Sequence, residues 1–159
     1  MGDPKNRNLK SLFETLGIGA VLIGFVFVGI EIRQNTAAIQ AATMQGLTDA
    51  SQEYMLLLGS DAELAEIVRK GRNAPDQLNE IESTQYFYFM RAKWMRYQNA
   101  FFQYQRGTIG DEDWAFHDSL ICGSGGSRNN WQDHRAIMSK SFVNYAEACF
   151  SDNDRPSIE

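Results

Sequence analysis

An uncharged, strongly apolar stretch near the start of the chain constrains its fold more than any other feature. Residues 15–30 contain no charged side chain, and ten of these sixteen residues are large and apolar. As a helix they extend about 24 Å, and including Leu12 and Phe13 brings the length close to that of a bilayer core of about 30 Å. The stretch predicts a transmembrane helix over residues 12–30, preceded by a basic N-terminal segment, residues 1–11.

Two other interpretations of the apolar stretch remain open. A buried core helix of a soluble protein has a similar composition. A cleaved signal peptide also begins with basic residues and continues with an apolar stretch. However, Glu31 and Arg33 precede the first small-residue site, near residues 37–42, and cleavage regions are usually neutral there. We therefore favour a single-pass membrane anchor that is retained in the protein.

Three small residues, Gly17, Ala20 and Gly24, share one face of this predicted helix. Small residues allow two helices to approach closely in lipid, so this face is the predicted contact with a second membrane helix. Glycine is also common in membrane helices in general, which explains the same pattern without a partner.

The basic residues on the two sides of the apolar stretch predict its orientation. Lys5, Arg7 and Lys10 precede the stretch, whereas Arg33 is the one basic residue within twenty positions after it. Basic residues favour the cytoplasmic side. We therefore expect a cytoplasmic N-terminus and a C-terminal part on the outer side of the membrane, which is the periplasm in a Gram-negative cell.

The apolar pattern continues beyond the predicted membrane segment. Apolar and small residues recur at alternating three- and four-residue steps over residues 32–57, as on one stripe of a helix, and no proline occurs between residue 31 and Pro75. The pattern predicts that the membrane helix continues as one long helix to about residue 58. We expect Gly59 to end it.

Shorter helices are predicted over the remainder of the chain. Ser60 and Glu63 have the spacing of a capping box for a helix over residues 61–70, which we expect to stop at Gly71. Asn79 and Glu82 form a similar pair. The further helices are predicted over residues 80–106, 111–122, 131–138 and 142–150. The fold class is therefore all-α, with a small helical bundle in an extramembrane domain, residues 31–150, and a disordered tail, residues 151–159.

Six large residues step by three and four along the predicted helix 80–106. Beside arginines and a lysine, such an aromatic row is able to bind single-stranded nucleic acid, a lipid surface or a flat pigment. The same spacing is more typical of the core of a helical bundle. We interpret the row as the core seam of the bundle: Phe87, Met90, Trp94, Tyr97, Phe101 and Tyr104.

Few residues have the pattern of a catalytic or metal site. Asp113 and His117 share a helix face and are able to start a metal site, but no Glu-x-x-His pair accompanies them. The glycine-rich segment 123–128 matches no phosphate-binding fingerprint and is interpreted as a flexible loop. We predict no catalytic residue, no metal and no cofactor. Cys122 and Cys149 are candidates for one disulfide in an oxidising compartment, and for buried thiols otherwise.

Several short motifs follow the apolar helix in a characteristic order. They are GIEIRQNT at residues 29–36, AATMQ at 41–45, SDAELA at 60–65, FFQY at 101–104 and GTIGDEDW at 107–114. This succession resembles a widespread family of uncharacterised bacterial membrane-anchored proteins, in which an apolar helix continues into an "IRQNT" stretch. The resemblance covers nearly the whole chain and implies a single-pass, mostly helical protein without an assigned active site.

These patterns predict a non-enzymatic protein. We expect a structural or accessory subunit of a larger membrane assembly or a homo-oligomer, whose partners are the lipid bilayer and other membrane subunits or copies of itself. A net charge of −5 gives no reason to expect a nucleic acid partner. The alternative is a membrane-tethered sensor or ligand-binding module, with a pocket beside the aromatic helix 80–106. A metalloenzyme that uses His117 is a third hypothesis.

Overall fold

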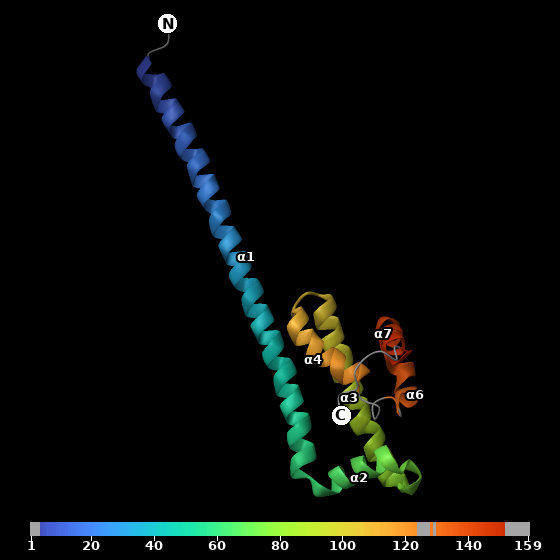
Figure 1. Cartoon of the computed structure of the whole chain (residues 1–159). Helices are drawn as coiled ribbons and strands as arrows, with labels where there is room; N and C mark the ends of the chain where they lie inside the picture. Colours follow the sequence, from blue (N-terminus) through green and yellow to red (C-terminus); the bar gives the residue numbers. More distant parts are fainter. Residues whose placement is uncertain (1–3, 124–127, 129, 152–159) are drawn as a thin grey trace. The chain divides into compact units, whose positions relative to one another are not determined.

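The computed structural model describes residues 4–123, 128 and 130–151, and for residues 4–15 the backbone alone. Within this part of the chain all regular structure is helical, so the predicted all-α class is confirmed (Figure 1). Two short 3-10 turns, η1 (Pro75–Gln77) and η2 (Arg135–Ile137), interrupt the α-helices. The α-helices are α1 (Pro4–Ser60), α2 (Ala62–Asn73), α3 (Glu80–Gln105), α4 (Asp111–Cys122), α6 (Trp131–His134) and α7 (Lys140–Ser151).

The chain divides into two compact units, Met1–Ala41 and Ala42–Glu159. The boundary falls inside α1, so one helix contributes to both units. We call the described part of the second unit the head. The predicted long helix that continues out of the apolar segment is therefore present, and its last five turns belong to the head.

The end of α1 differs from the prediction. The helix continues through Gly59 and ends at Ser60, whose hydroxyl donates to the Leu56 carbonyl at 2.7 Å. Because this hydroxyl is bonded to the preceding turn, Ser60 does not cap the next helix. Asp61 caps it instead, with its carboxylate accepting from the Leu64 N–H at 3.0 Å.

The prediction that Gly71 stops the second helix is wrong. Helix α2 continues to Asn73, and Gly71 is buried inside it. A Cβ atom at this position would lie 2.5 Å from the ring of Tyr86 on α3. Because glycine has no side chain, α2 and α3 are able to pack closely at this point. The residue lowers the intrinsic helix propensity of α2 in return.

Replacing Gly71 with alanine is expected to destabilise the head by about 1–3 kcal/mol, because the Tyr86 ring has to move out of its packed position. Gly46→Ala is the matched control, since nothing in the structure lies within 4 Å of a Cβ there. That variant is expected to stabilise the helix by about 0.5–1 kcal/mol. Urea unfolding in nonionic micelles, followed by tryptophan fluorescence, measures both, since the three tryptophans all lie in the head. Changes of the same sign in the two variants would contradict this role of Gly71.

Helix α3 begins and ends where the sequence indicates. The Asn79 side chain accepts from the Glu82 N–H, and the Glu82 carboxylate accepts from the Asn79 N–H, each at 2.9 Å, which completes a capping box. After the helix, Gly107 has φ +71°, a left-handed conformation that favours glycine.

The head is built around α3, which packs against α2 and α4, while α4 packs against α7. Four residues of the predicted seam are buried: Met90, Trp94, Tyr97 and Phe101. The other two are half-buried at its ends, Phe87 beside the ring of His134 and Tyr104 stacked on Trp114. The seam therefore lies where a bundle core requires it.

Candidate functional site

Among the described residues, nothing buries the apolar segment of α1. Its large apolar side chains between Leu16 and Ile30 are 49–72% exposed. One described helix is long and apolar enough to cross a membrane, and none of its most apolar window is buried. A core helix of a soluble protein would bury such side chains, because each one contributes about 1.5–3 kcal/mol when it leaves water.

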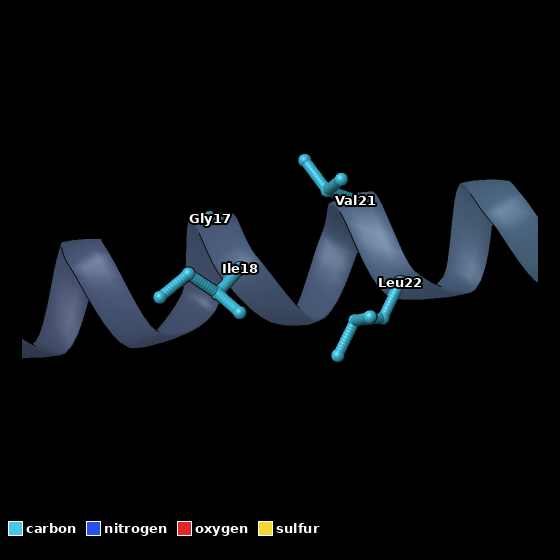
Figure 2. Close-up of a pocket in the computed structure, with 4 residues that line it drawn as sticks. All are labelled: Gly17, Ile18, Val21 and Leu22. Carbon is cyan, nitrogen blue, oxygen red and sulfur yellow. The ribbon is translucent and has the colours of Figure 1, made fainter.

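The predicted contact face lies within this exposed segment. Figure 2 shows a shallow depression lined by Gly17, Ile18, Val21 and Leu22, with Ile18 and Leu22 projecting to the same side of the helix. Nothing in the described structure lies within 4 Å of a Cβ built at Gly17 or Gly24. The face of Gly17, Ala20 and Gly24 is thus uncovered within the described chain, and its contact with a second helix stays a prediction.

The two cysteines are joined. Cys122, the last residue of α4, pairs with Cys149 of α7, with 5.4 Å between their Cα atoms. Both residues are buried in the larger core cluster of the head. The bond therefore ties the C-terminal helix to the bundle across the glycine-rich segment, of which residues 124–127 lie outside the described residues.

Removing this disulfide is expected to lower the free energy of unfolding of the head by about 3 kcal/mol, because it closes a loop of 27 residues. The double variant Cys122→Ala and Cys149→Ala and the reduced wild-type protein should unfold at similar, lower urea concentrations. Dithiothreitol should have no effect on the double variant, which provides the control. If reduction frees two thiols in the wild type without changing its unfolding midpoint, the expectation is wrong.

His117 and His134 are both buried in the head. Burial lowers the pKa of both imidazoles, with a further lowering of the pKa of His117 by Arg96 and an opposing effect from Asp113. Within the described part of the chain, no three His, Cys, Asp or Glu side chains gather as metal ligands. The structure therefore does not extend the Asp113–His117 pair into a larger set.

A buried lysine on α3 was not anticipated from the sequence. Lys93 is 7% exposed and follows Met90 by three positions, on the face that forms the seam. Its Nζ lies 5.5 Å from the centroid of the Tyr97 ring. Burial and the nearby guanidinium groups of Arg72 and Arg96 lower the pKa of Lys93 to about 8. Lys93 lies three residues after Met90 and four before Tyr97, and this helical spacing is the sequence signal that places it on the core face.

The depressed pKa of Lys93 predicts a rise in stability at alkaline pH. Below about pH 8 the amine is protonated in both the folded and the unfolded chain, and the folded state bears the cost of a buried charge. Between pH 8 and 10 the folded state releases the proton while the unfolded state keeps it. The free energy of unfolding should rise by about 2 kcal/mol over this range.

Lys93→Met is expected to abolish that rise, since it removes the amine that titrates. Urea unfolding at pH 7, 8, 9 and 10 checks this expectation. The range ends at pH 10 because burial raises the pKa of Tyr54 and of Tyr97, which opposes stability at higher pH. An equal slope in the wild type and the variant would assign the pH dependence to other groups.

A groove of about 360 Å³ runs between the part of α1 that belongs to the head and the start of α4. Met44, Leu47 and Met55 line it from α1, and Phe116 and His117 line it from α4. The predicted pocket lay beside the aromatic helix α3. This groove is a different site, lined from α1 and α4, and the pocket beside α3 stays a prediction.

Comparison of the chain with protein-family models, with curated proteins and with solved structures finds no match. The family resemblance of the sequence motifs therefore stays a prediction. The predicted tail also stays untested, since Ser151 closes α7 and residues 152–159 lie outside the described residues.

Proposed function

We propose that this protein is a non-enzymatic, single-pass protein of the bacterial inner membrane that acts as a structural or accessory subunit. Helix α1 anchors the chain in the bilayer, and the head serves as its extramembrane domain. The partners are other subunits of a membrane assembly or further copies of the chain. The observation that carries the proposal is an apolar helical segment, long enough to cross a bilayer, of which none is buried.

Two observations support a periplasmic head. The first is the disulfide between Cys122 and Cys149, since such bonds persist in oxidising compartments and are rare in the cytosol. The second is the excess of basic residues before the apolar segment, which favours a cytoplasmic N-terminus.

Labelling with a membrane-impermeant maleimide tests the orientation. In the variant without native cysteines, the added substitution Glu63→Cys, at an exposed position, should react with the maleimide in intact spheroplasts. A cysteine at Asn6, before the apolar segment, should react only after lysis. The reverse pattern would place the head in the cytoplasm and contradict this part of the proposal.

The mass of the protein in its native assembly tests the accessory role. Extraction from the native membrane with a mild detergent, followed by native mass spectrometry, should give a species heavier than the 18.0 kDa chain. If the small-residue face forms the contact, Gly24→Leu should lower the amount of the heavier species, because the leucine side chain prevents the two helices from approaching closely. Gly19→Leu is the matched control, because Gly19 lies on the opposite side of the helix from Gly17 and Gly24. An 18.0 kDa monomer without companions would contradict the role.

A further inference from the structure

The groove between α1 and α4 combines an apolar interior with an acidic margin. Its apolar surface comes from the two methionines Met44 and Met55, from Leu47 and from Phe116, whose side chain is 60% exposed. Its volume of about 360 Å³ lies in the range of small-molecule sites. Methionine side chains adapt their shape to a ligand, and an exposed phenylalanine offers a flat ring against which an apolar body is able to pack.

His117 adds a polar group to this groove that the described protein leaves without a hydrogen bond. The residue is 6% exposed and lines the groove. Its one ring contact is with the neighbouring Phe116, at 5.5 Å between centroids. A neutral imidazole has one donor and one acceptor nitrogen, and those of His117 are not among the fully enclosed polar atoms that lack a partner, so they are accessible from the groove. The geometry therefore leaves hydrogen-bonding capacity inside the groove for a bound molecule.

The charge of the groove indicates the sign of that molecule. Glu112 and Asp113 line it, and none of its ten lining residues is a lysine or an arginine. The two carboxylates also lie in the first turn of α4, where they stabilise the helix through its dipole. That role explains their place in the helix but not the unbonded imidazole one turn further along the same wall.

We propose that the α1–α4 groove is a binding site for a small organic cation, an amine with an apolar body. The apolar body packs between the methionines and Phe116. The ammonium group donates to the neutral imidazole of His117 and is attracted by Glu112 and Asp113. The site lies within the head, so it does not depend on the membrane anchor or on the accessory role.

Binding of 2-phenylethylammonium to the full-length protein in nonionic micelles tests the proposal. The chain has two histidines, whose imidazole resonances are followed in ¹⁵N-labelled protein. The His117 resonances report binding in the groove, and those of His134, which does not line the groove, serve as the internal control. We expect a saturable shift of His117 in roughly the millimolar range, as for a ligand of this size, with His134 unchanged. The neutral isostere 2-phenylethanol and the anion phenylacetate should bind at least tenfold more weakly or not at all.

Charge variants make the test specific. Glu112→Gln and Asp113→Asn should each weaken ammonium binding by about threefold, as expected for exposed charge pairs. Glu63→Gln is the matched control, since Glu63 is also a first-turn acid of a 12-residue helix and does not line the groove. Lowering the pH should weaken binding as His117 becomes protonated, because the imidazolium, together with Arg96, then opposes the attraction of the carboxylates.

Three results would overturn the proposal. One is the absence of a saturable His117 shift with 2-phenylethylammonium, and another is equal or tighter binding of phenylacetate. The third is a His117 shift on simple dilution of the protein without any probe, which would show that a second copy of the chain fills the groove.

Discussion

The double variant Leu22→Lys with Phe25→Lys is expected to leave the membrane. A lysine at the centre of an inserted helix costs about 2.5–3.5 kcal/mol, so the pair costs about 5–7 kcal/mol. Leu, Ile, Phe and Val each contribute only about 0.3–0.6 kcal/mol in favour of insertion. Eight such residues remain between Leu16 and Ile30 once Leu22 and Phe25 are replaced, and together they contribute about 2–5 kcal/mol, so they do not offset two lysines.

The matched control uses the same helix outside the apolar segment. Leu56 and Leu57 of α1 are also exposed, at 70% and 50%, but belong to the head. Leu56→Lys with Leu57→Lys should leave the protein in the membrane. Flotation in a sucrose gradient distinguishes membrane-bound from aggregated protein. If both double variants float with the membranes, the apolar segment is not the anchor.

The second large effect is expected from Trp94→Ala. Trp94 is fully buried and packs against Trp131, with 4.6 Å between ring centroids. Its indole N–H donates to Asn130 at 2.9 Å, and Asn130 in turn donates to the Tyr86 hydroxyl. The variant loses about 3–5 kcal/mol from the cavity, and the bonded oxygen of Asn130 is left buried without its donor. Since domains are stable by about 5–15 kcal/mol, much of the head should unfold at 37 °C.

Limited proteolysis and near-ultraviolet circular dichroism measure this loss. Met95→Ala is the control, because Met95 follows Trp94 on the same helix but is 55% exposed, and it should change stability by less than about 0.5 kcal/mol. Trp94→Phe keeps an aromatic ring without the N–H and should lie between the two. Equal protease resistance of Trp94→Ala and Met95→Ala would show that the core is not organised around Trp94.

Local sequence patterns predicted the helices well wherever the controlling interaction is itself local. The Asn79–Glu82 capping box and the left-handed Gly107 involve residues close in sequence, so they were predictable. Gly71 was misread as a stop because its role depends on Tyr86, fifteen positions away on another helix. The Asp61 cap was missed because Ser60 offers the same chemistry one residue earlier, and only the backbone geometry decides between them.

The groove could not be predicted from sequence patterns, because it too depends on residues far apart in the chain. Its two walls come from residues 44–55 and 112–117, which no periodicity connects. The four-residue spacing of Asp113 and His117 places them on one face of a helix, and as a sequence pattern it indicates at most the start of a metal site. The methionines of α1 that complete the groove belong to a stripe that, in sequence, indicates only a helix.

One measurement tests the membrane anchor most directly, namely the intact mass and location of the unaltered protein after an alkaline carbonate wash of native membranes. We predict the complete chain of 18.0 kDa in the washed membrane fraction, released only by detergent. Complete chain in the supernatant without detergent would contradict the anchor. A shorter soluble chain that begins near residues 37–42 would contradict it equally, because the apolar segment would then be a signal peptide that is removed.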